Sequence, residues 1–414
     1  MYNEWIVAYE AGDISAVVMI DMSAAFDVVD ISILLDKLKI YGFQDCSINW
    51  LSSYLTNRKQ QVFIDGNLSE PLDLEAGVPQ GSILGPLLYT LFTNDLPEVI
   101  HNHADEANEV NEAIFQMNCK ECGGICCYAD DTTFTKSAKD PLIVKKEIEV
   151  KYKELSEYMS NNKLCINSDK THLLVMTSSK MHKIHGNFGI TLNTGTEIIE
   201  PQDHEYLLGG IISSNFKWIE HIRDHKKSML NQITSRLNAL NKISRISSFK
   251  TRKVIADGII MSKFSYLIQL YGGTSEFLIN LLQKLQNKAA RLVTKLDWYT
   301  PVPVLMNQCG WLSIRQLIVY HSLVLVFKTK NNTKPEYLHN KLFPDYSQKT
   351  RLTSSNGIRL RPGKKKQTEL GNQNFVPSAS MLWNNLPPKI RQLESIGKFK
   401  IDLKIWIKTN VSIQ

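Results

Sequence analysis

Apolar and polar positions along the first half of the chain predict strands and helices in mixed order. Residues 16–20 are an uninterrupted apolar run that predicts a buried strand ending at Asp21. Before it, an apolar stripe predicts a helix over residues 1–15 that starts without a cap. Further on, residues 141–162 have the 3.6-residue period of an amphipathic helix. This mixture predicts an α+β or open α/β domain.

Residues typical of turns and helix caps mark the ends of the other elements expected in this half of the chain. Asp30, Asp45 and Ser82 each precede an apolar helical pattern and are predicted N-caps. A hairpin is predicted with strands at 61–64 and 68–74 around Asp65-Gly66-Asn67. Two later strands are expected at residues 164–167 and 173–177.

The second half of the chain has a different pattern. From Trp218 to about residue 345 the periodicity is helical almost throughout, with helices beginning near Trp218, Ser248, Ser275 and Leu312. Residues 346–378 are polar and basic and predict a linker, and residues 379–414 predict one or two short helices. The expected domains are therefore 1–215, 216–345, 346–378 and 379–414.

Composition and charge narrow the class of protein. The chain has 414 residues, 43% of them hydrophobic, and a net charge of +7. The charge is concentrated, because residues 222–253 hold nine Lys or Arg and one acid. Such an excess fits a polyanionic partner. No apolar run reaches the ~18 residues of a membrane span, and no signal peptide is recognisable. A soluble, intracellular protein is expected, in cytoplasm or nucleus.

Cysteine and histidine residues suggest a second, separate feature. Residues 97–124 are polar and look like a surface insertion. It contains four residues of the two types, His and Cys, that zinc prefers: His101, His103, Cys119 and Cys122. One C-x-x-C pair is half of a convincing zinc signature, so reduced cysteines in an exposed loop are the alternative.

Two adjacent acids mark the strongest candidate for chemistry. Asp130 and Asp131 lie between an apolar run, 125–127, and a β-prone run, 132–135, at the expected tip of a hairpin. If this hairpin pairs with the strand ending in Asp21, three carboxylates converge. Carboxylate oxygens are the ligands Mg²⁺ prefers, and the set suits two-metal phosphoryl transfer.

The order of these motifs resembles a known family. The strand ending in Asp21, the Phe26-Asp27 pair, the loop Gly77-Val78-Pro79-Gln80-Gly81-Ser82-Ile83-Leu84-Gly85-Pro86 and Tyr128-Ala129-Asp130-Asp131 are similar to motifs of reverse transcriptases of non-LTR retrotransposons, the jockey-like group especially. The resemblance implies a right-hand polymerase palm, an antiparallel sheet with helices on one face, followed by an all-helical thumb. It also implies an RNA-directed DNA polymerase with two Mg²⁺ ions, an RNA template, a DNA primer and deoxynucleoside triphosphates.

The same resemblance assigns expected roles to single residues. It makes Asp21, Asp130 and Asp131 the metal ligands, Phe26 the steric gate against a ribose 2′-hydroxyl, and Gln80 with Gly81 a contact to template and nucleotide. Lys170 is implied to protonate the leaving pyrophosphate. Leu208 and Gly209 belong to an expected primer-grip hairpin near residues 205–215, in which Gly210 replaces the usual β-branched residue and is expected to loosen the strand.

The chain also departs from the family pattern. Neither an endonuclease domain nor fingers precede Asp21, so an N-terminal truncation and weak activity of this chain alone are expected. Because fingers bring positive charge to the triphosphate, a catalytically idle remnant that only binds nucleic acid is the alternative. A magnesium phosphohydrolase built on the same acids is a third reading.

Overall fold

The computed structural model describes residues 1–101, 124–178, 188–332, 335–343, 360, 370 and 374–411. Two compact units are present. Unit 1 comprises Met1 and Ala8–Asp203, and unit 2 comprises Tyr2–Val7 and His204–Gln414. Helix α1 (Tyr2–Ala11) contributes to both. The division at residue 203 places the expected primer-grip segment in unit 2, and the naming of the parts as palm, thumb and linker stays a prediction.

Unit 1 is built on a five-stranded sheet in the order β11-β8-β1-β7-β6. The central strand β1 (Ile14–Ile20) pairs antiparallel with β7 (Asp131–Ala138) on one side and β8 (His172–Met176) on the other. Strand β6 (Ile125–Tyr128) pairs antiparallel with β7, whereas β11 (Pro201–Gln202) runs parallel to β8. The sheet is therefore mixed, which corrects the expectation of a purely antiparallel one.

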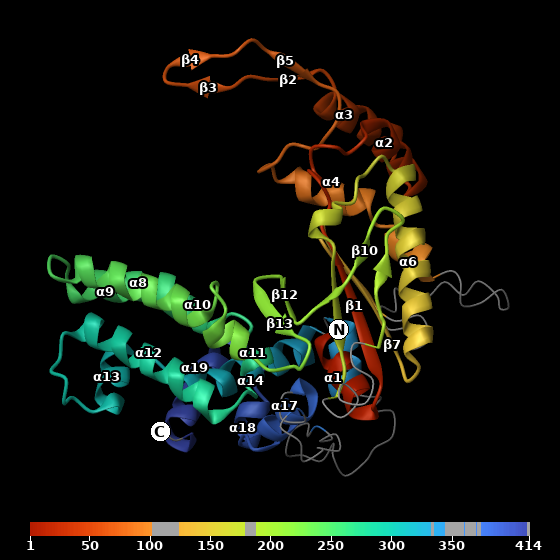
Figure 1. Cartoon of the computed structure of the whole chain (residues 1–414). Coiled ribbons are helices and arrows are strands. Elements are labelled where there is room, and N and C mark those ends of the chain that lie inside the picture. Colours follow the sequence, from red (N-terminus) through yellow and green to blue (C-terminus); the bar gives the residue numbers. More distant parts are fainter. Residues whose placement is uncertain are drawn as a thin grey trace. The chain divides into compact units, whose positions relative to one another are not determined.

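The core of unit 1 lies between this sheet and its helices. All seven residues of β1 are buried, and the even-numbered ones belong to a core cluster that includes Val144, Ile148 and Leu155 of α6 (Pro141–Asn161). Figure 1 shows α6 running along β1 and β7. The uninterrupted apolar pattern of β1 arises because a central strand is covered on both faces.

Two helices lie between β1 and the loop at Gly77, and a third follows that loop. Helix α2 (Ile31–Ile40) is capped as predicted, since the Asp30 carboxylate accepts from the Ile33 amide at 3.0 Å. Helix α3 spans Asp45–Leu55 and α4 spans Leu84–Phe92. The prediction that Asp45 caps α3 is wrong, because Gln44 takes the cap position and Asp45 lies in the first turn, where its charge complements the helix dipole.

A long hairpin extends from the end of α3 (Figure 1). Strands β3 (Phe63–Ile64) and β4 (Asn67–Leu68) form its tip, and β2 (Arg58–Gln60) and β5 (Leu72–Leu74) form its base. The turn at Asp65-Gly66 has positive φ at both residues, as a type I′ turn requires. The predicted hairpin is confirmed.

The remaining elements of unit 1 are short. They are α5 (Leu96–His101), the 3-10 turn Ser168–Lys170, β9 (Leu192–Asn193) and β10 (Ile198–Ile199). The strand expected at residues 164–167 is reduced to one bridge between Met22 and Ile166.

Unit 2 begins with the hairpin of β12 (His204–Leu207) and β13 (Gly210–Ser213) and is otherwise helical. The helix expected at Trp218 is a π-helical turn, Glu220–Asp224. The helices are α8 (Met229–Ser244), α9 (Phe249–Ala256), a π turn (Asp257–Met261), α10 (Ser262–Ser265), α11 (Ile268–Tyr271), α12 (Glu276–Thr294), α13 (Val302–Cys309), α14 (Ile314–Asn332), α15 (Glu336–Leu342), α17 (Phe375–Asn384), α18 (Pro388–Arg391) and α19 (Ile396–Asn410).

Over the described ranges, no single helix is long and apolar enough to cross a membrane, although α13 and α14 together pass that test as a pair bent by 44°.

Candidate active site

The register of the central strands brings the predicted acids to one end of the sheet. Because β1 and β7 run antiparallel with Ile20 opposite Thr132, the residue after β1 and the first residue of β7 are neighbours. These residues are Asp21 and Asp131. Asp130 lies one residue earlier, in the turn that joins β6 to β7.

The turn that presents Asp130 is tight. Tyr128 pairs with Asp131, which leaves only Ala129 and Asp130 between the two strands. Ala129 has φ of 53°, and Asp130 is not in the positive region, a combination typical of the II′ turns that suit twisted hairpins. The strand twist therefore fixes where the acid pair points, at the cost of a strained alanine.

The other two carboxylates act on Asp131 electrostatically. Burial raises the pKa of Asp131 above its ordinary value, and the charges of Asp130 and Asp21 raise it further, whereas Lys170 lowers it. The Lys170 ammonium lies 2.7 Å from Oδ2 of Asp21, and this hydrogen bond and charge raise the pKa of the lysine. Lys170 is thus protonated at neutral pH and offsets part of the negative charge.

Within the described residues, no group of three or more His, Cys, Asp or Glu side chains is positioned to hold a metal ion. The donors nevertheless suit one, since carboxylate oxygens are the ligands of Mg²⁺. One oxygen of Asp21 is engaged by Lys170 instead. The repulsion that raises the pKa of Asp131 is what a divalent cation at this end of the sheet would relieve.

Phe26 forms a ring stack beside these acids. Its ring lies 4.7 Å from that of Tyr89, centroid to centroid, at 29°. Tyr89 is buried in α4, and its hydroxyl donates to Sδ of Met22 at 3.0 Å. Burial raises the pKa of Tyr89, and the charges of Asp130, Cys127 and Asp21 add to the effect. Sequence reasoning missed Tyr89, because one tyrosine in an apolar helix looks like any core aromatic.

The glycine loop is joined to the segment after Asp21. The amides of Gly77 and Val78 donate to the carbonyls of Val29 and Phe26, both at 2.8 Å. A Cβ on Gly77 would lie 2.6 Å from the carbonyl oxygen of Asp27, so only glycine fits.

The side chain of Gln80 completes this connection. Its Nε2 donates to both carboxylate oxygens of Asp27 at 2.9 Å. Gly81 follows in an exposed position with φ of 75°. Asp27 was not predicted to act here, and only its place directly after Phe26 could have suggested it.

The expected primer-grip residues form the turn of the β12–β13 hairpin. Leu208 and Gly209 both have positive φ, and the Tyr266 hydroxyl donates to the Leu208 carbonyl. Gly210 is buried and paired with Leu207, and a Cβ there would lie 2.7 Å from Leu267 Cδ1. That Gly210 loosens the strand stays a prediction.

The basic region 222–253 is only partly available for a ligand. Arg252 is 5% exposed and donates to the carbonyls of Val293 and Ser247, so it holds helices together. Arg223 and Lys253 are paired with Asp224 and Asp257. The exposed basic residues without such a pair among the described residues include Lys226, Lys242, Arg245 and Lys250.

The proposed zinc ligands are not tested. The side chain of His101, together with His103, Cys119 and Cys122, lies outside the described residues.

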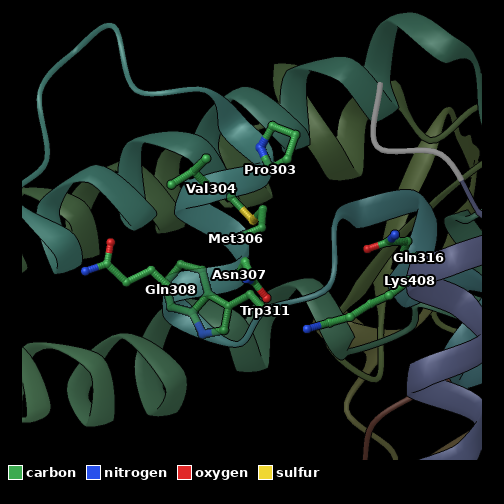
Figure 2. A pocket seen from close by; sticks show the side chains of 8 residues that line it. All are labelled: Pro303, Val304, Met306, Asn307, Gln308, Trp311, Gln316 and Lys408. Atoms are coloured by element: carbon green, nitrogen blue, oxygen red, sulfur yellow. The ribbon is translucent and has the colours of Figure 1, made fainter.

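A pocket of about 530 Å³ opens in unit 2 beside α13, lined by Pro303, Val304, Met306, Asn307, Gln308, Trp311, Gln316 and Lys408 (Figure 2). Its lining contains no carboxylate, and the Lys408 ammonium is its one charged group. The pocket therefore lacks the ligands that the phosphoryl-transfer chemistry needs.

A comparison with known protein families agrees with this arrangement of acids and glycine loop. Residues 8–212 match the model described as reverse transcriptase (RNA-dependent DNA polymerase). This stretch is therefore a reverse transcriptase domain.

Curated relatives place the domain near non-LTR elements. The chain is 28% identical over 301 residues to the RNA-directed DNA polymerase from mobile element jockey of Drosophila funebris, covering 72% of this chain and 30% of that protein. It is 24% identical over 315 residues to the probable RNA-directed DNA polymerase from transposon BS of Drosophila melanogaster, covering 76% and 33%. The chain thus spans about a third of the length of these relatives.

A solved telomerase from Candida tropicalis, in complex with a fragment of telomeric RNA, also aligns with this chain. The alignment covers 100% of this chain and 51% of the telomerase, at 10% identity and a TM-score of 0.37. This likeness is too slight to support an inference.

Proposed function

We propose that this chain is the polymerase core of a non-LTR retrotransposon reverse transcriptase, which copies RNA into DNA by two-metal nucleotidyl transfer. One observation carries the proposal: the β1–β7 register makes Asp21 and Asp131 neighbours, and the charges of Asp130 and Asp21 add to the effect of burial in raising the pKa of Asp131. Domains of this family generally use divalent metal ions, and these three residues are the proposed Mg²⁺ ligands.

Two bound Mg²⁺ ions would supply activation of the primer hydroxyl and stabilisation of the leaving pyrophosphate. The residues themselves contribute the remaining chemistry. Lys170, whose pKa is raised by Asp21, keeps its proton at neutral pH and can donate it to the departing pyrophosphate as a general acid.

Selection of the sugar is assigned to Phe26. A rigid ring in the path of the 2′ position excludes a ribose hydroxyl by contact alone. The stack on Tyr89, whose hydroxyl is tied to Met22, supports this assignment because it leaves the Phe26 ring little freedom to move aside.

Nucleic acid positioning is assigned to three places. Gln80 and Gly81 are proposed to contact template and incoming nucleotide, with the amide of Gln80 oriented by Asp27. The Leu208-Gly209 turn is proposed to contact the primer strand. The exposed basic residues around α8 and α9, Lys226, Lys242, Arg245 and Lys250, are suited to phosphates, so binding is expected to weaken as salt increases.

Primer extension with Mg²⁺, deoxynucleoside triphosphates and a DNA primer on an RNA template tests the proposal. The intact chain is expected to extend the primer above the background given by Asp130→Ala. Binding of the template-primer, measured in parallel, separates the competing function. Equal extension by the two proteins, with tight binding by both, would favour a catalytically idle nucleic-acid binder and overturn the polymerase assignment.

A further inference from the structure

One face of α12 carries a line of basic side chains. Lys284, Lys288, Arg291 and the first residue after the helix, Lys295, follow at intervals of four, three and four. At 3.6 residues per turn these positions fall within about 60° of one another. The opposite face is the buried one, with Leu282, Gln286, Ala289 and Val293 in the core.

Acids do not neutralise this line. Lys284, Lys288 and Lys295 are exposed, and none of them forms an ion pair with a described residue. Glu276, at the start of the helix, is already paired with Arg315. The positive charge therefore faces solvent along the second half of α12, over about 16 Å from Lys284 to Lys295 at 1.5 Å per residue.

The line ends at two exposed aromatic rings. Trp298 is 70% exposed and Tyr299 is 93% exposed, in the loop between α12 and α13. The guanidinium of Arg291 lies 4.6 Å from the Trp298 ring centroid, and its Nη2 donates to the Trp298 carbonyl at 3.3 Å. One basic residue of the line thus holds the tryptophan by its ring and by its backbone.

The support beneath this surface is rigid. The buried Arg252 of α9 donates to the Val293 carbonyl at 2.9 Å, near the carboxyl end of α12. Gln286 donates to the Leu312 carbonyl at 2.8 Å and fixes the middle of the helix. The loop itself closes with a bond of 3.0 Å from the Thr300 amide to the Asp297 carbonyl. Little ordering is then needed when a ligand binds.

We propose that Lys284, Lys288, Arg291, Lys295, Trp298 and Tyr299, together called the α12 platform, bind single-stranded nucleic acid. The lysines track the phosphates, and unstacked bases lie on the two exposed rings. Basic grooves combined with aromatic stacking surfaces are how single strands are held without sequence readout. A duplex, whose bases are already stacked, could use the lysines but not the rings.

This site is independent of the proposed polymerase chemistry, because it needs no metal and none of the three acids. The positive charge of this surface indicates which kind of ligand it binds. A protein partner or a second copy of this chain could cover the rings, but neither accounts for a continuous line of unpaired cations leading to them.

Fluorescence anisotropy with a labelled 12-nucleotide oligouridylate and the full chain tests the proposal. The double variant Trp298→Ala/Tyr299→Ala is expected to bind about tenfold or more weakly, from the loss of base stacking. The conservative variant Trp298→Phe/Tyr299→Phe is expected to bind within about threefold of the intact chain, since rings remain. Both positions are exposed, so the melting temperatures stay unchanged.

Charge is tested separately. Lys284→Gln/Lys288→Gln is expected to make the slope of log K against log salt shallower by about 1.4, two charges at about 0.7 each for single strands. The matched control, Lys146→Gln/Lys153→Gln, removes the same charge from exposed positions on α6 and is expected to leave the slope within about 0.3 of the intact chain.

Three results would overturn the proposal. The alanine variant could bind oligouridylate as tightly as the intact chain does. It could lose as much affinity for a 12-base-pair duplex as for oligouridylate. It could lose self-association and keep its oligonucleotide binding. Asp130→Ala is expected to bind oligouridylate as the intact chain does, so failure of the platform and failure of the polymerase proposal give different results.

Discussion

Replacing Gly77 by alanine tests how tightly the glycine loop is joined to the segment that follows Asp21. Gly77 has φ of 86°, a region that costs an L-residue roughly 1–2 kcal/mol. The added Cβ would also lie 2.6 Å from the Asp27 carbonyl oxygen and 2.9 Å from its Cα, both backbone atoms that cannot turn away. Overpacking of this kind costs roughly 1–3 kcal/mol, so the total is about 2–5 kcal/mol.

Gly81 offers a matched control in the same loop. Its φ is 75°, but an added Cβ meets no atom within 4 Å, so Gly81→Ala carries only the backbone cost of roughly 1–2 kcal/mol. The difference between the two variants isolates the contact with Asp27. For a unit of this size it corresponds to a melting temperature about 2–12 °C lower for Gly77→Ala.

The assay is thermal unfolding of both variants and the intact chain under one set of conditions. The account also predicts that Gly77→Ala weakens primer extension more than its stability loss explains, because the displaced Asp27 is adjacent to Phe26 and bonded to Gln80. Equal melting temperatures for the two alanine variants would refute the reasoning.

Three further outcomes are expected. Burial lowers the pKa of His221 to about 4, so the unfolded chain binds more protons than the folded chain between pH 6.5 and 4. The free energy of unfolding therefore falls by roughly 3 kcal/mol as the pH drops through that window. Thermal unfolding of His221→Gln should lack this loss. The folded-state pKa of Asp131 is raised, so the contribution of Asp131 to the free energy of unfolding is more favourable at low pH and is lost as the pH rises through that pKa. Without divalent ions, Asp131→Asn should therefore melt at a higher temperature than the intact chain at pH 7 and at the same temperature at pH 3. Phe26→Val should admit ribonucleotides in a primer-extension assay while Tyr89, its stacking partner, is retained, and continued rejection of ribonucleotides would remove the steric-gate role.

Local patterns in the sequence predict the elements that local physics determines. The apolar run before Asp21, the cap at Asp30 and the Asp65-Gly66 turn each depend on a few neighbouring residues, and the structure confirms them. The strand expected at 164–167 failed for the opposite reason. Its pairing is with a distant residue, Met22, and periodicity does not reveal how many ladder bonds form there.

The candidate site also has one part that the sequence predicts and one part that only the fold reveals. The acids are recognisable because their types and order are unusual, whereas the supporting contacts join residues far apart in sequence. Tyr89 beneath Phe26 and the bonds from Gln80 to Asp27 required the fold. The α12 platform was hidden because its lysines look like an ordinary solvated helix face until the position of Trp298 is known.

Electron paramagnetic resonance of Mn²⁺ binding tests the central claim most directly, that Asp21, Asp130 and Asp131 form one cation site. The account predicts that the intact chain binds Mn²⁺ and that Asp21→Asn and Asp130→Asn each weaken binding. It also predicts that the double variant is little worse than either single one, because residues of one site are not additive. Unchanged Mn²⁺ binding by Asp21→Asn would contradict the account.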